Sequence, residues 1–407
     1  MTGYSHVTSA MAFEPTEPYG ELREQCPFHK VADHDPPFYV LSRFDDILDM
    51  LKQPDLWING DGPGVFYQER GVLGTTDEPD HTRHRHVLRP AFLPTAIQRL
   101  RPLVEGIASG LLDEMLAGSS ADFVEAFAAP FPGLVIAELL GVPDDDREEF
   151  RRWTDLAVDA LTGGDLERYR EAKLALEGHI ARGIDERDAR LAASGRAASL
   201  DLMGSTLPDD VLTRLAVART QGTIDTDEAL YLGYQLLVAG HETTTSLLGL
   251  MLYRLLEHPE AMARLRAEPS LLPAAIEEAL RFDSPVHGLF RTNAVETEVH
   301  GETLAPRTKV QVLFASANRD PSRFAAPDEF RIDRDPHEIG RHMAFGWGIH
   351  HCIGAPLARL QVLVAFELLL QRTATITLDG AAERNQSFVL HGLTHLPIRW
   401  TTHPERT

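Results

Sequence analysis

The chain has 407 residues, 43% of them hydrophobic and 25% charged, which is typical of a globular protein with a sizeable core. Its formal net charge of −22 argues against a nucleic-acid binder and against an anionic membrane surface as the main partner, because both need a basic face. The two cysteines, Cys26 and Cys352, form no disulfide framework, and no segment looks like a signal peptide or a membrane span, so we expect a cytoplasmic protein.

The first part of the chain, residues 1–20, is polar and contains prolines, and we expect a loose arm there. The rest, residues 21–407, should form one domain. A short strand is expected at Phe38–Leu41. From Asp77 to about Leu280 most segments have helical periodicity, and the run Ala189–Ser199 should be a surface connection.

Histidines and arginines crowd the segment Asp77–His86, where His81 and Arg85 would share one helix face. The ordinary interpretation of such a segment is a solvated basic surface. A zinc site formed by His81, His84 and His86 is an alternative, although no cysteine or carboxylate spacing supports it.

A long helix is expected from an N-cap at Thr226 to Pro259, about 30 residues or roughly 45 Å. Its centre contains Gly240, Glu242 and Thr243, and glycine and threonine are poor helix formers. The Thr243 hydroxyl can bond back to a carbonyl one turn earlier and bend or open the helix. A simple kink with solvent-facing threonines is the alternative.

A further helix should begin at Pro273 and place Glu278 and Arg281 on one face, by default as a surface salt bridge. Beyond it, helical character gives way to β-structure and to an irregular stretch. The expected segments are strands at Thr297–Val299 and Lys309–Phe314, irregular chain at Asn318–His342, a helix at Pro356–Leu370, and strands at Thr375–Leu378 and His395–Trp400.

Three glycines surround Cys352 in the segment Phe345–Pro356, and glycine permits the close backbone approach that a loop around a sulfur needs. Pro356 suits the first turn of a helix, so Cys352 should lie at a helix N-terminus, which favours a thiolate. An inert buried cysteine and a Cys–His hydrolase with His350 or His351 as base are alternatives. An iron ligand fits better, since N–H donors around the sulfur would tune the metal.

The spacing of Phe345, Gly348, Cys352 and Gly354 resembles the haem-binding loop of the cytochromes P-450. Three further segments resemble family motifs in the expected order. These are the run Ala239–Thr243, the Glu278–Arg281 pair with Arg334 as its third member, and the basic segment that contains His81 and Arg85. The resemblance implies a mainly α fold with a smaller β part in a single domain, and the activity of a haem-thiolate monooxygenase.

The resemblance also implies roles for individual residues. Cys352 would bind the iron of haem b (iron-protoporphyrin IX). Thr243 would hydrogen-bond bound dioxygen, Glu242 would help to deliver protons, and Gly240 would leave room beside them. The residues implied to contact the haem are His81, Arg85, Arg291, Phe345, Gly346, His350 and Gly354; the two histidines and the two arginines would bind its propionates.

No flavin or nicotinamide domain is visible, so electrons should come from a ferredoxin with an NAD(P)H-dependent ferredoxin reductase. Local cations could dock that partner: Arg89, Arg99, Arg101, Arg341 and Arg359. The variable segments that line substrate pockets in the family are mainly apolar here, which indicates a small to medium apolar substrate. Their side chains are Val65, Phe66, Leu156, Leu161, Val238, Val286, Leu289, Phe290, Val389 and Leu390, with His287 and His391 as possible polar anchors.

Two other functions stay open at this point. One is a peroxide-driven or isomerising haem enzyme of the same fold, and the other is a non-catalytic haem-binding protein. The intact pair Glu242 and Thr243 disfavours both, because neither function needs proton delivery to dioxygen.

Overall fold

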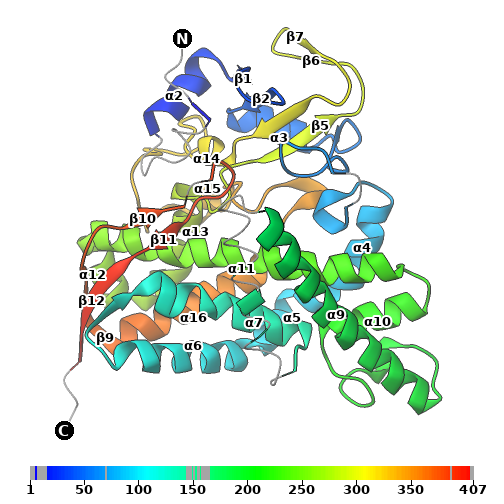
Figure 1. The fold of residues 1–407 in the computed structure, drawn as a ribbon. Helices are drawn as coiled ribbons and strands as arrows, with labels where there is room; N and C mark the ends of the chain where they lie inside the picture. Colours follow the sequence, from blue (N-terminus) through cyan, green and yellow to red (C-terminus); the bar gives the residue numbers. More distant parts are fainter. Residues whose placement is uncertain are drawn as a thin grey trace.

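A helical body lies beside a smaller β-rich part that carries the N-terminus (Figure 1). The computed structural model describes residues 5–6, 16–68, 71–143, 149, 152–153, 156, 166–385 and 387–403. The helices are α2 (Thr16–Gln25), α3 (Phe44–Leu51), α4 (Asp80–Leu88), α5 (Pro94–Arg99), α6 (Arg101–Leu116), α7 (Pro130–Leu140), α9 (Leu166–Ser194), α10 (Val211–Thr220), α11 (Thr226–Glu257), α12 (Pro259–Ala267), α13 (Leu272–Phe282), α14 (Phe314–Ala317), α15 (Pro336–Ile339) and α16 (Ala355–Arg372). The predicted mainly α fold with a smaller β part is confirmed.

Within the described residues the strands form one main sheet and three smaller ones. They are β1 (Phe28–Val31), β2 (Phe38–Leu41), β3 (Trp57–Ile58), β4 (Ser120–Asp122), β5 (Leu289–Asn293), β6 (Thr297–Val299), β7 (Glu302–Leu304), β8 (Lys309–Val312), β9 (Thr373–Leu378), β10 (Glu383–Arg384), β11 (Leu393–His395) and β12 (Pro397–Thr402). The main sheet has the order β1-β2-β8-β5-β3, in which only β2 and β8 run parallel.

The predicted strands at Phe38–Leu41 and Thr297–Val299 are confirmed. The strand predicted to end at Phe314 ends at Val312, because Phe314 already belongs to the short helix α14. The last predicted strand is two strands, β11 and β12, since the buried Leu396 separates them.

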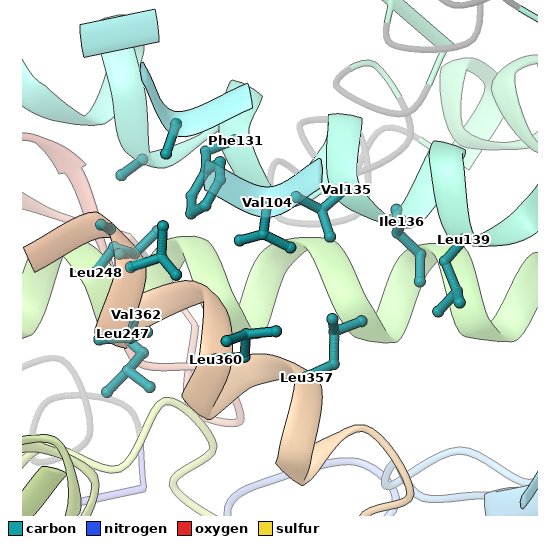
Figure 2. Packing of buried hydrophobic residues seen from close by; sticks show 14 of the residues in the cluster. Val104, Phe131, Val135, Ile136, Leu139, Leu247, Leu248, Leu357, Leu360 and Val362 are labelled. Atoms are coloured by element: carbon teal, nitrogen blue, oxygen red, sulfur yellow. The ribbon is translucent and has the colours of Figure 1, made fainter. Parts of the chain in front are cut away.

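Helix α11 crosses the centre of the helical body, with α7 packed on one side and α16 on another (Figure 2). Figure 2 shows Val135 and Ile136 of α7 facing α11, and Leu357 and Leu360 of α16 approaching it from the opposite side. These four side chains are at most 3% exposed, and burying each contributes roughly 1.5–3 kcal/mol. This packing fixes the start of α16, and with it the cysteine loop, beside α11.

Two expectations about surface segments were wrong. Residues 16–20 belong to α2 rather than to a loose arm, because Tyr19 is 1% exposed and is hydrogen-bonded to His287 Nδ1 at 2.7 Å. The predicted connection Ala189–Ser199 is helical as far as Ser194, since Leu191 of α9 is buried against Leu202 and Val217.

The pair Glu278 and Arg281 is not a surface salt bridge, because both residues are fully buried. Arg281 donates to both carboxylate oxygens of Glu278 at 2.8 Å, and Arg334 donates to the same oxygens at 3.0 Å. The predicted third member, Arg334, is therefore confirmed. Both arginines also donate to backbone carbonyls between Asn318 and Glu329, and so hold the irregular stretch that leads to the cysteine loop.

None of the helices that the structure describes combines the length and apolarity needed to cross a membrane.

Candidate active site

Cys352 lies in the loop between α15 and α16. Its N–H donates to the carbonyl of Phe345 at 2.9 Å, which closes the loop. The turn requires positive φ at Gly346 and Gly348, +69° and +71°, a conformation that residues with side chains rarely adopt. The N–H groups of Gly354 and Ala355 donate to the sulfur, as the glycine-rich sequence predicted.

The side chain of Cys352 is the chemically reactive group of this loop. It has accessible surface, yet the surrounding protein desolvates the sulfur. This burial raises the pKa of the Cys352 thiol, although the Gly354 and Ala355 N–H groups and Arg85 oppose the effect. The Gly354 and Ala355 N–H groups favour the thiolate, as expected at a helix N-terminus, while burial has the larger and opposite effect. A cation bound at the sulfur would reverse that balance.

A cluster of basic side chains, His81, Arg85, Arg291 and His350, lies beside this loop. The rings of His81 and His350 are 4.3 Å apart between centroids. Arg291 is 4% exposed, forms no ion pair among the described residues, and has its pKa lowered to about 10 by burial. Burial and the charges of Arg291, His81 and Arg85 lower the pKa of His350 to about 3. Arg85 also donates to the His351 carbonyl at 2.9 Å, which ties α4 to the cysteine loop.

The cluster has the chemistry of an anion site. His81 Nε2 and His350 Nδ1 are buried without a hydrogen-bond partner among the described residues. An anion would accept these bonds and balance the charge of Arg291. The carboxylates of haem have this chemistry, so these residues fit the cofactor that the sequence resemblance implies.

The alternative zinc site is wrong, since the described residues contain no group of three or more side chains placed to hold a metal ion. His84 is turned to Glu228, at 3.1 Å from Nε2 to Oε1, and His86 lies exposed on the surface.

The centre of α11 carries the second set of candidate residues. The Thr243 hydroxyl donates to the Ala239 carbonyl at 2.8 Å, as predicted. The helix nevertheless stays continuous from Thr226 to Glu257, so the expected opening is absent. Gly240 faces α7, where an added Cβ would lie 3.4 Å from Ile136 Cδ1, and the glycine thus permits close helix packing.

The start of α11 differs from the prediction by one residue. Asp225 is the N-cap, and its side chain accepts from the Glu228 N–H while the Glu228 side chain accepts from the Asp225 N–H. This capping box satisfies two free backbone donors at the helix start.

Glu242, next to Thr243, is an acid with a strongly altered proton affinity. Burial alone raises the pKa of Glu242 to about 7. A group with a pKa near neutral pH both holds and releases protons readily, which suits acid–base chemistry. The chemistry available on α11 is therefore proton transfer through Glu242 and the Thr243 hydroxyl.

The apolar wall is smaller than the sequence suggested. Val65 and Phe290 are core residues, and Phe66 is 68% exposed. The expected wall residues that are partly accessible are Leu156, Val238, Val286, Leu289, Val389 and Leu390. Leu161, Gly163 and Gly164 lie outside the described residues.

His287 and His391 were expected as polar anchors. They are 0% and 2% exposed, respectively. They are therefore not surface histidines. Strand alternation directs them away from their partly accessible neighbours Val286 and Leu390, which pair in a β-bridge.

Sequence reasoning overlooked Gln235, which lies on the same side of α11 as Glu242 and is partly accessible. Its polar type within an apolar run was the only available signal.

The five arginines proposed for partner docking are not equivalent. Arg101 is bound to Glu105 and Glu367, and Arg359 donates to both oxygens of Glu277 at 2.6 and 2.7 Å. Arg89, Arg99 and Arg341 are exposed and form no ion pair with described residues. Trp347, in the cysteine loop, is 38% exposed and lies close to Arg341 in sequence.

Comparisons with known proteins agree with this geometry. The family model described as Cytochrome P-450 matches residues 154–388. The polyketide biosynthesis cytochrome P-450 PksS of Bacillus subtilis is 34% identical over 94% of this chain and 95% of its own length. The cytochrome P-450 monooxygenase PikC of Streptomyces venezuelae is 35% identical over 96% of this chain and 92% of its own.

Solved structures give the same result. The cytochrome P-450 CYP109Q5 from Chondromyces apiculatus superposes with a TM-score of 0.84 at 31% identity and covers 97% of this chain and 98% of its own. CYP109E1 from Bacillus megaterium in complex with testosterone has a TM-score of 0.82 at 30% identity, with 95% of this chain and 99% of its own covered.

Proposed function

The chain belongs to the cytochrome P-450 family and is a monooxygenase, and we propose that Cys352 binds the iron of haem b. One observation carries the proposal. The accessible sulfur of Cys352, held by two N–H donors, lies in a loop that also bears His350 of the basic cluster. One site thus provides a soft sulfur ligand for iron and cationic partners for the two carboxylates of haem.

Bound haem supplies the iron chemistry that activates dioxygen, with one oxygen atom going to the substrate and the other leaving as water. The protein's own part is to bind and to move protons. Arg291, His81 and His350 bind the carboxylates, with Arg85 beside them. The Thr243 hydroxyl would supply a proton to the chemistry of the haem, and the Glu242 carboxyl group would restore that proton.

The substrate is proposed to be a small to medium, largely apolar molecule. Partly accessible Val238, Val286, Leu289, Val389 and Leu390 support this, since apolar side chains dominate the walls of such sites. A structural neighbour binds testosterone, and a relative is named 6-deoxyerythronolide B hydroxylase, which is consistent with a substrate of this size.

Electrons are proposed to come from a ferredoxin that an NAD(P)H-dependent reductase keeps reduced. The protein as a whole is acidic, with a net charge of −22, so an acidic partner needs a local basic surface. The exposed Arg89, Arg99 and Arg341 supply unpaired positive charge for that contact.

The test is the absorbance spectrum of the reduced protein under carbon monoxide. Wild-type protein should give the strongly red-shifted Soret band of a thiolate ligand, and Cys352→Ala should lose it together with turnover. The matched control is Cys26→Ala, the other cysteine, which should behave as wild type. An unchanged band in Cys352→Ala would refute the assignment.

The electron source is tested separately. Product should form with NAD(P)H, a ferredoxin and its reductase under air. Haem binding is checked in a second measurement, in which Arg291→Gln should lose haem more readily than wild type on dilution. Turnover that needs added peroxide and ignores the ferredoxin would favour the peroxide-driven alternative instead.

A further inference from the structure

One face of α11 is open although the helix lies at the centre of the protein. Most residues from Ala229 to Leu255 are buried, and those that keep accessible surface include Gln235, Val238, Ala239, Glu242 and Thr243. We call these five residues the open face. Their separations of three, four and seven residues place them on one side of the helix. They therefore border the same interior space.

Gln235 is the polar residue of the open face that the proposed function leaves without a role. Its Oε1 atom is buried and has no hydrogen-bond partner among the described residues. A buried amide without a partner is costly, and native proteins rarely keep one without a reason. The amide can turn, so that it offers either an acceptor oxygen or a donor N–H to the same position.

The loop Leu73–Thr75 lies close to the Gln235 amide, since a Cβ added at Gly74 would lie 3.5 Å from Gln235 Nε2. The two buried histidines do not compete for this role, because His287 and His391 are at most 2% exposed.

We propose that Gln235 is a specificity-determining residue, whose side-chain amide hydrogen-bonds a hydroxyl or carbonyl oxygen of the substrate. The proposal rests on the proposed function and narrows its substrate class. Gln235 lies eight residues before Thr243, which corresponds to about 12 Å along the helix axis. The preferred substrate is therefore an apolar molecule that carries an oxygen atom away from the carbon that is oxidised.

The physical effect is selection against plain hydrocarbons. A hydrocarbon leaves the Gln235 amide without a partner, whereas an alcohol or ketone of the same skeleton satisfies it. Sites built to hydrogen-bond a substrate group reject analogues that lack the group, because their own polar atoms are then unpaired. We expect a preference of about tenfold or more for the oxygen-bearing member of a pair.

The experiment measures binding by the spin-state shift of the ferric, haem-loaded protein. Three matched pairs serve as probes: dodecanol with dodecane, androstanone with androstane, and menthol with menthane. In at least one pair wild type should prefer the oxygen-bearing member about tenfold, and Gln235→Leu should reduce this ratio to about one. The control Gly74→Ala adds a methyl at ordinary contact distance from the amide and should keep the ratio.

Three results would overturn the inference. They are no preference in any pair for wild type, a preference that survives in Gln235→Leu, and a preference that Gly74→Ala abolishes equally, which would indicate crowding rather than hydrogen bonding. The carbon monoxide spectrum is recorded for every variant. If wild type lacks the red-shifted band the proposed function fails, whereas a normal band with unchanged discrimination refutes only the role of Gln235.

Discussion

Replacing Glu242 by glutamine should stabilise the protein at alkaline pH and much less at acid pH. The carboxyl group of Glu242 lies inside the protein, and burial is the sole cause that raises its pKa from 4.5 to about 7. The folded protein therefore binds the Glu242 proton more tightly than the unfolded chain does. Glutamine has a similar shape and never carries the charge.

The magnitude follows from the difference between the two pKa values. A shift from 4.5 to about 7 corresponds to about 3 kcal/mol, at 1.36 kcal/mol for each pKa unit. Between these pH values the folded state holds more protons, so the free energy of unfolding falls as the pH rises through this window. Above about pH 7 both states are ionised and the penalty is constant. Below pH 4.5 both states are protonated and the penalty vanishes.

The assay is urea unfolding of haem-loaded wild type and Glu242→Gln at pH 5 and pH 8. The stability difference between the two proteins should be larger at pH 8 by about 2–3 kcal/mol. Glu260→Gln on α12 is the control, because that side chain is 75% exposed and its loss should change little at either pH. An equal difference at both pH values would refute the reasoning that Glu242 is buried and protonated near neutral pH.

Two further outcomes follow from the site. Thr243→Ala should lower the amount of product formed per NAD(P)H consumed by about tenfold. Thr243→Ser keeps the hydroxyl and should stay close to wild type. Equal yields in both variants would contradict the role of the hydroxyl. Arg334→Met should lower the free energy of unfolding, measured in urea, by about 3–5 kcal/mol, because it removes one partner of a buried network. Arg264→Met should lower it by less than about 1 kcal/mol, because the pair of Arg264 with Asp333 is exposed. Equal costs for the two arginines would show that burial does not decide the value of these ion pairs.

The parts of the site that sequence could predict depend on local spacing. The cysteine loop needs glycines within a few residues of Cys352, and Glu278 and Arg281 share a helix face whatever surrounds them. The back-bond from Thr243 to Ala239 is likewise a property of one helical turn. Such features follow from short stretches of sequence, and the structure has them where they were predicted.

The parts that sequence could not predict depend on contacts between distant segments. Residue Tyr19 is ordered by a hydrogen bond to His287, which lies 268 residues later, so composition alone made α2 look like a loose arm. The pKa of Cys352 depends on how many atoms surround the sulfur, and that number follows from the whole fold. The open side of α11 was invisible for the same reason, because helical periodicity does not tell which face other elements cover.

One partly buried acid, Glu228, links the two halves of the site. Glu228 belongs to the capping box that starts α11, and its two carboxylate oxygens also accept from Arg83 at 2.6 and 2.8 Å. Hydrogen bonds and the charge of Arg83 lower the pKa of Glu228 to about 2, so it stays ionised throughout the physiological range.

Arg83 lies on α4, between the residues His81 and Arg85 of the basic cluster. The ion pair thus joins the helix that would hold the haem carboxylates to the helix that bears Glu242 and Thr243. Charge-assisted bidentate pairs fix orientation as well as distance, so this pair helps to set how α4 meets the start of α11. The site therefore depends on a contact far from the reacting atoms for the alignment of its proton donors with its cofactor.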